Sequence, residues 1–185
     1  MPGVEEEHRL GGRVAVLAIH GGLEGGTAEL AGAVADRTGA SLYVCRQTVR
    51  RVHLASHRFM PAGSPALGAV LAHADVVISL HGYGRWSQPR DILLGGSARD
   101  LAREVALALG EYAPDFAAID DLARIERPLR GLHPDNPVNG TRLGGVQLEL
   151  PHLARGSSPR QAAGDTTTPD PTVVTALCAV AAAWA

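Results

Sequence analysis

Short apolar runs alternate along this chain with segments of helical periodicity. Apolar runs of four to eight residues are typical of strands in a sheet that is covered on both faces, and regular alternation of strands and helices predicts an α/β fold with a mostly parallel sheet. The predicted strands are residues 13–19, 42–45, 76–80, 116–119 and 146–150. The predicted helices are residues 27–38, 64–74, 97–110 and 170–185.

Helix boundaries carry the expected signals. Thr27 is the predicted N-cap of the first helix and Gly39 its end, and Ser64-Pro65 and Asp170-Pro171 open two later helices. The remaining segments are predicted to lack regular structure: an N-terminal tail (1–12), an irregular stretch (47–61), a loop (82–96), a long structured loop (128–145) and a mobile connection (156–169).

Length and charge favour a single domain and give no support for a nucleic-acid-binding or membrane protein. A chain of 185 residues with 45% hydrophobic residues suits one domain, residues 1–185, and the net charge of −2 gives no overall field for nucleic acid or a membrane surface. The start is acidic and resembles no secretory signal, and the apolar run near the end is too short for a membrane span. Two cysteines make no disulfide framework, so a reduced, cytoplasmic protein is the expectation.

Candidate chemistry lies at the ends of two predicted strands. His20 follows the first and His81 the third, each is followed by glycine, and Glu24 lies four residues after His20. In open α/β sheets ligands bind outside the carboxyl ends of the strands, and a catalytic zinc is commonly held by three such protein ligands. The neighbouring glycines allow positive φ, which would bend both side chains toward one point; they are Gly21, Gly22, Gly25 and Gly26. A hydrogen-bonded turn histidine with a glutamate near the positive end of a helix is the open alternative.

Residues 146–150 alternate apolar and polar positions, which places Gln147 and Glu149 on one face of a strand beside a cleft. His53 and His57 lie in the irregular stretch, where a loop position is favoured and the cleft is the alternative. Cys45, in an apolar strand, is expected to be an inert core thiol.

Four ordered motifs resemble the poly-γ-glutamate hydrolase family over roughly residues 13–155. They are His20-Gly-Gly-Leu-Glu24-Gly-Gly-Thr27, Ser79-Leu-His81-Gly82, Leu94-Gly95-Gly96 and Gly145-Val-Gln147-Leu-Glu149-Leu150. The resemblance implies a three-layer α/β/α domain with a mixed sheet, similar to zinc carboxypeptidases. It implies that His20, Glu24 and His81 bind Zn²⁺ and that Glu149 is the catalytic carboxylate. Two histidines and one glutamate also favour zinc over other divalent ions.

The expected substrate is an anionic γ-glutamyl amide, either poly-γ-glutamate or a small γ-glutamyl or N-acyl amino acid. If the polymer is the substrate, the enzyme would have to be released from the cell. Arginine suits both a substrate carboxylate and a developing oxyanion. The predicted substrate-binding residues are Arg85, Arg142, Asn139, Arg155 and Gln147.

Two other classes stay open. A non-catalytic metal- or ligand-binding domain would keep the ligands without turnover. A phosphate-binding loop at residues 21–27 is disfavoured, because it lacks the Gly-Lys-Ser/Thr ending and Glu24 would repel phosphate. No Gly-x-Ser-x-Gly elbow is present, which argues against a serine hydrolase.

Overall fold

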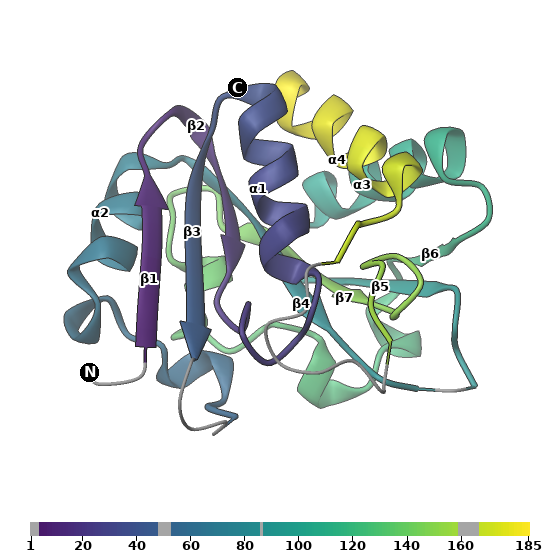
Figure 1. The fold of residues 1–185 in the computed structure, drawn as a ribbon, viewed down its shortest axis with the longest axis horizontal. Coiled ribbons are helices and arrows are strands. Elements are labelled where there is room, and N and C mark those ends of the chain that lie inside the picture. Colours follow the sequence, from purple (N-terminus) through teal and green to yellow (C-terminus); the bar gives the residue numbers. More distant parts are fainter. Residues whose placement is uncertain (1–3, 48–52, 86, 159–166) are drawn as a thin grey trace.

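The computed structural model describes residues 4–47, 53–85, 87–158 and 167–185. In this part of the chain seven strands form one sheet in the order β1-β3-β2-β4-β7-β5-β6 (Figure 1). β1 is antiparallel to β3 and β5 is antiparallel to β7, and the other neighbouring pairs are parallel. The strands are β1 (Val4–Arg9), β2 (Gly12–Ala18), β3 (Ala40–Gln47), β4 (Val76–Gly82), β5 (Asp91–Gly95), β6 (Ala117–Ile119) and β7 (Gly145–Leu150). The predicted mixed, mostly parallel sheet is confirmed.

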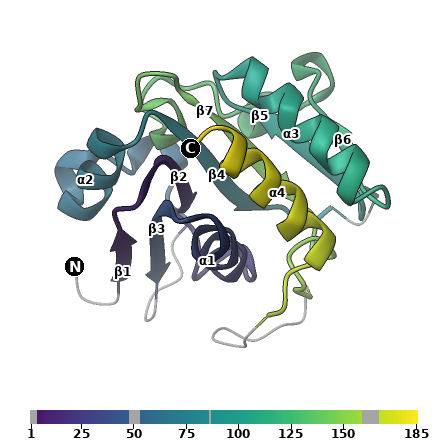
Figure 2. The ribbon, with the colours of Figure 1, turned by 90° about the horizontal axis from the view of Figure 1, so that it is seen from above.

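Helices cover both faces of the sheet, which gives the predicted three layers. α1 (Thr27–Thr38), α3 (Arg99–Tyr112) and α4 (Pro171–Ala183) share one core with one face of the sheet, and α2 (Pro65–His73) packs on the other (Figure 2). Burial on both sides explains why most residues of the central strands β2, β4 and β7 are apolar, and the polar ones on β4 and β7 include His81, Gln147 and Glu149. No helix within these described ranges is long and apolar enough to cross a membrane.

Three of the four predicted helix-boundary signals are observed. The Ser64 hydroxyl accepts from the backbone N–H of Leu67 at 3.0 Å, Asp170 accepts from Thr172 and Val173, and Gly39 ends α1 with φ of 72°. The start of α1 differs, because its cap is Gly26 and Thr27 is already helical. The Thr27 hydroxyl donates back to the carbonyl of Glu24 at 2.8 Å instead.

Gly26 occupies the cap because no side chain fits there. Its φ is 90°, and a Cβ would lie 2.1 Å from the carbonyl oxygen of Arg155. Of the four glycines predicted to take positive φ, Gly26 alone does so. Gly21 and Gly22 serve close approach: a Cβ would lie 2.9 Å from Cβ of Ala28 and 2.5 Å from the backbone nitrogen of Gln47, respectively.

Two strands were predicted as irregular structure. β1 lies in the predicted N-terminal tail. It is an edge strand of the described sheet and pairs with β3, so its residues can be charged and exposed, and the sequence shows no apolar strand pattern there. β5 lies in the predicted loop 82–96, and its apolar run, Ile-Leu-Leu, is too short to stand out among glycines. The connection predicted at residues 156–169 lies mostly outside the described residues, and the long loop at 128–145 is structured, as predicted, with a 3-10 turn at Pro137–Asn139.

Candidate metal centre

His20 and His81 lie at the same edge of the sheet. β2 and β4 are adjacent and parallel, so their carboxyl ends meet there; His20 follows β2 and His81 is the second-last residue of β4. Both histidines are buried, with 2% and 3% of their surface exposed. Their ring centroids are 5.1 Å apart, which brings the two imidazoles to one site.

Glu24 lies between the two imidazoles. Its Oε1 is 3.1 Å from Nδ1 of His20, and its Oε2 is 3.5 Å from Nδ1 of His81. The backbone N–H of Gly82 donates to Oε2 at 2.9 Å and fixes the carboxylate. One ligand atom from each of the three residues lies within 4.8 Å of the others, and two imidazole nitrogens with one carboxylate oxygen suit a zinc-type cation.

The outward ring nitrogens of both histidines have partners as well. Nε2 of His20 lies 2.8 Å from the carbonyl oxygen of Leu54, and Nε2 of His81 lies 3.3 Å from the Ser79 hydroxyl. A carbonyl only accepts, so Nε2 of His20 carries a proton and Nδ1 faces the carboxylate. This is the arrangement of metal-ligating histidines, whose second nitrogen is held by an outer partner.

The electrostatics of Glu24 and His81 reflect their closeness. Burial by itself would raise the pKa of the Glu24 carboxyl, but hydrogen bonds from His20 and His81, and the charges of the two rings, hold that pKa well below its usual range. Burial opposes the charged form of His81, yet the hydrogen bond and charge of Glu24 and the charge of Glu149 raise its pKa above the usual value. The Glu24 carboxyl is therefore ionised beside the two imidazoles, which is the form that can bind a cation.

Glu149 lies beside this cluster on the neighbouring strand. β7 is parallel to β4, and the Cα atoms of His81 and Glu149 are partners in the register. Only 5% of Glu149 is exposed, and burial raises the pKa of its carboxyl to about 7. Such a carboxyl exchanges a proton readily near neutral pH.

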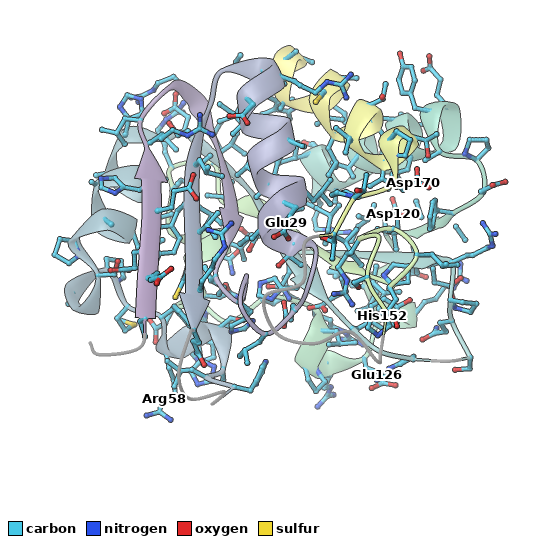
Figure 3. The ribbon with its side chains drawn as sticks, viewed as in Figure 1. Glu29, Arg58, Asp120, Glu126, His152 and Asp170 are labelled. Atoms are coloured by element: carbon cyan, nitrogen blue, oxygen red, sulfur yellow. The ribbon has the colours of Figure 1, made fainter. Side chains whose placement is uncertain are left out.

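A cavity of about 470 Å³ opens above these residues. Its lining includes His20, Glu24, His81, Gln147 and Glu149, and two segments, residues 53–57 and 127–136, supply other lining residues. Figure 3 shows Arg58 and Glu126, each next to one of these segments, at the end of the molecule toward which the β3 strand runs. The pocket thus lies at the carboxyl edge of the sheet, where the sequence predicted it.

The predicted arginines lie elsewhere. Arg85 pairs with Glu126, and Arg142 lies 3.4 Å from Asp75 on the surface. The buried Arg155 donates to the carbonyls of Leu150, Gly25 and Tyr83. None of these three arginines is among the described residues that line the pocket.

Of the two amide residues predicted to bind substrate, Asn139 and Gln147, one lines the pocket. Asn139 also lies outside the described pocket lining; it accepts from the backbone N–H of Ser97 and donates to the carbonyls of Gly131 and His133. Gln147 does line the pocket, and its amide donates to Glu149 and accepts from Asn136.

Sequence reasoning missed several pocket residues. Arg127 lines the pocket but has no motif that separates it from the other arginines, and His133 stacks on His57 with centroids 4.5 Å apart. His53 also reaches the site, with Nε2 3.9 Å from Oε1 of Glu24. His53 and His57 both line the pocket, which was the alternative prediction for them and not the favoured one.

The sequence of this chain is similar to known proteins. A family model described as poly-gamma-glutamate hydrolase matches residues 2–167. The SPbeta prophage-derived UPF0714 protein YoqZ of Bacillus subtilis (strain 168) is 32% identical over 142 residues, which cover 75% of this chain and 48% of that protein. The chain therefore spans about half the length of this curated relative.

Solved structures share the fold. A bacteriophage poly-gamma-glutamate hydrolase matches with a TM-score of 0.80 and 24% identity, covering 98% of this chain and 89% of that one. YNDL in its zinc-free form matches with a TM-score of 0.75 and 26% identity, covering 96% of this chain and 87% of that one. A proposed carboxypeptidase of Burkholderia mallei matches with a TM-score of 0.56 at 12% identity, covering 99% and 63%, so the fold is carboxypeptidase-like.

Proposed function

This chain belongs to the poly-γ-glutamate hydrolase family, a family of hydrolases, and we propose that it is a zinc-dependent enzyme that cleaves the amide bond of γ-glutamyl substrates. One observation carries the proposal: the two Nδ1 atoms and the carboxylate of His20, Glu24 and His81 converge beside the buried carboxyl of Glu149 in one pocket. A metal-dependent hydrolytic site combines a cation centre with an adjacent proton acceptor.

The donor set fits zinc. Zinc accepts imidazole nitrogens and carboxylate oxygens, and a catalytic site keeps three protein ligands with one open position. His20, Glu24 and His81 would hold the ion. When bound there, zinc polarises the carbonyl of the scissile amide and lowers the pKa of water toward neutrality. The zinc-free form of YNDL, which shares this fold, supports a zinc site in this chain.

Glu149 would move the proton. As a carboxylate it accepts a proton from the attacking water, whose oxygen forms the new bond to the amide carbon. As a carboxylic acid it then donates that proton to the nitrogen of the leaving amine while the carbon–nitrogen bond breaks. A pKa of about 7 suits both steps, because the two forms are close in free energy at neutral pH.

A γ-glutamyl substrate carries a free carboxylate beside each amide. Arg127 is the arginine we assign to that carboxylate, since it lines the pocket while the predicted Arg85, Arg142 and Arg155 are held by other partners. Guanidinium binds a carboxylate through two parallel N–H donors. Either the polymer or a small γ-glutamyl or N-acyl amino acid satisfies this chemistry.

The test compares wild type with Glu149→Gln on poly-γ-glutamate and on small γ-glutamyl and N-acyl amino acids. We expect the zinc-loaded wild type to release amine or shorten the polymer, and Glu149→Gln to lose about 10²- to 10⁴-fold in rate with zinc content unchanged. Glu104→Gln, an exposed carboxylate on α3, is the matched control and should keep full activity. Full activity of Glu149→Gln would exclude Glu149 as the base, and a wild type inactive on every substrate would favour a non-catalytic binding domain.

His81→Ala tests the metal centre separately. Loss of one of three ligands should sharply lower the zinc bound per chain, measured by elemental analysis after dialysis. A variant that still holds one zinc per chain would remove His81 from the site.

A further inference from the structure

Glu149 is the end of a buried chain of side-chain amides. Nε2 of Gln147 donates to Oε1 of Glu149 at 2.8 Å, and Nδ2 of Asn136 donates to Oε1 of Gln147 at 2.9 Å. All three residues line the pocket, and 3–5% of the surface of each is exposed. Water therefore has little access to compete for these hydrogen bonds.

Backbone groups at both ends fix the direction of this chain. The N–H of Val138 donates to Oδ1 of Asn136 at 3.2 Å, which turns the NH₂ group of Asn136 toward Gln147. The carbonyl of Leu129 accepts from Nε2 of Gln147 at 3.4 Å. A backbone N–H can only donate and a carbonyl can only accept. Each of these two backbone contacts therefore requires the Gln147 amide to present its NH₂ group to Glu149.

Gly131 closes the space beside the Gln147 amide. Its φ is 62°, and a Cβ at this position would lie 2.7 Å from Oε1 and 2.8 Å from Cδ of Gln147. Glycine therefore lets the backbone of the long loop approach the amide more closely than any other residue would allow.

We infer that Gln147 is a positioning residue that acts through Glu149, with Asn136 and Gly131 acting through Gln147. This inference rests on the proposed role of Glu149 as the base. Because Oε1 is bound by the Gln147 amide, Oε2 is the oxygen that takes the proton from water and later donates it to the leaving amine. This role acts through Glu149, whereas the sequence predicted a substrate-binding role for Gln147.

Gln147→Met tests the inference, because methionine has a similar length and no donor. We expect kcat to fall about 10- to 100-fold with KM and zinc content unchanged, as when the partner that orients a reacting group is removed. Gln88→Met is the matched control and should leave kcat unchanged, because the described contact of Gln88 uses its backbone carbonyl. An unchanged kcat, or a raised KM at constant kcat, overturns the inference.

A glycine pair separates positioning from folding. Gly131→Ala and Gly39→Ala both place alanine at positive φ, with φ of 62° and 72°, but nothing lies within 4 Å of a Cβ at position 39. Both variants should lower the melting temperature, and Gly131→Ala alone should lower kcat. Equal kcat values in two folded variants contradict the role of Gly131.

Amide NMR gives a readout that needs no turnover. The side-chain NH₂ of Gln147, identified by its loss in Gln147→Met, should exchange slowly with solvent, and Glu149→Ala should speed that exchange. If Glu149→Ala leaves the exchange unchanged, the inference fails, whatever the activity. If the wild type cleaves no amide substrate while the exchange behaves as expected, the proposed function fails and the hydrogen-bonded chain stands.

Discussion

At the scale of residues, the candidate centre depends on groups that never face the pocket. Nδ1 of His20 points to the centre because Nε2 lies against the Leu54 carbonyl, and Ser79 is the corresponding partner of His81. Each outer partner selects which nitrogen is available. The hydrogen bonds of the Nε2 atoms thus determine whether the Nδ1 atoms are available to bind an ion.

Cys45 shows the opposite effect, a reactive group made inert. It is 3% exposed, and burial, assisted by the charge of Glu6, raises the pKa of its thiol to about 11. Only the thiolate reacts with iodoacetamide, so at about pH 8 roughly one Cys45 side chain in a thousand is reactive. We expect mass spectrometry to show much slower alkylation of Cys45 than of the more exposed Cys178 in the folded protein. The rate at Cys45 should rise about tenfold per pH unit up to about pH 11, and in denaturant the two cysteines should react alike; equal rates in the folded state would contradict the burial of Cys45.

The residues that were predictable are those with a position in a motif. His20 and His81 end adjacent apolar strands, so their meeting follows from the sheet, and Glu24 follows from the turn after His20. The Leu54 carbonyl has no signature in a sequence, since every residue has one. Arg127 was unpredictable for another reason: its place depends on the path of the long loop, which is set by tertiary contacts.

At the scale of elements, one hydroxyl joins the edge strand to a helix. Ser64 caps α2 by accepting from Leu67, and it donates to the carboxylate of Glu6 on β1. The Tyr43 hydroxyl on β3 donates to the same carboxylate at 2.6 Å. β1, which pairs with a single neighbour, is thereby fastened to the layer beneath it.

Ser64→Ala should therefore cost more than a lost helix cap. We expect the free energy of unfolding to fall by about 1–3 kcal/mol, because both the cap and a hydrogen bond to a carboxylate disappear. Urea denaturation measures the change, and hydrogen exchange should show the amides of β1 opening more often. Ser87→Ala, at an exposed position, should stay within about 0.5 kcal/mol, and an equal loss in both variants would contradict the link.

The elements that were predicted are those whose environment matches their pattern. β2 and β4 are apolar because both of their faces are covered, and α2 and α4 carry their caps in sequence. β1 could not be predicted because an edge strand tolerates charge. A strand of that kind is recognised only when its partner is known.

At the scale of the whole molecule, Arg155 fastens the ends of three strands together. Its guanidinium donates to the carbonyls of Gly25 after β2, Tyr83 after β4 and Leu150 at the end of β7. Of the residues of the proposed centre, His81 lies on β4, and His20 and Glu24 lie in the turn that follows β2. Geometry at the site thus depends both on the sheet edge and on the turn after β2, and Arg155 contacts both.

Arg155→Lys tests this connection. Lysine keeps the charge but lacks the planar fork, so buried carbonyls lose their donors and the free energy of unfolding should fall by roughly 2–4 kcal/mol. Zinc affinity, measured by competition with a chelator, should fall as well, because Gly25 adjoins Glu24 of the proposed metal centre. Arg103→Lys, an exposed position on α3, is the control and should change neither quantity. A stable Arg155→Lys with unchanged zinc affinity would show that the three strand ends hold their geometry alone.

The hydrogen bond from His20 to the Leu54 carbonyl has a thermodynamic consequence for the pocket rim. Residues 53–57 lie over the centre, and this contact joins their position to the orientation of a ligand. Linkage is reciprocal. If the hydrogen bond from His20 to residues 53–57 strengthens cation binding by some factor, a bound cation stabilises that hydrogen bond by the same factor. A substrate that contacts residues 53–57 would therefore change the affinity for the ion, and the ion would change the affinity for the substrate by the same factor, through the Leu54 carbonyl.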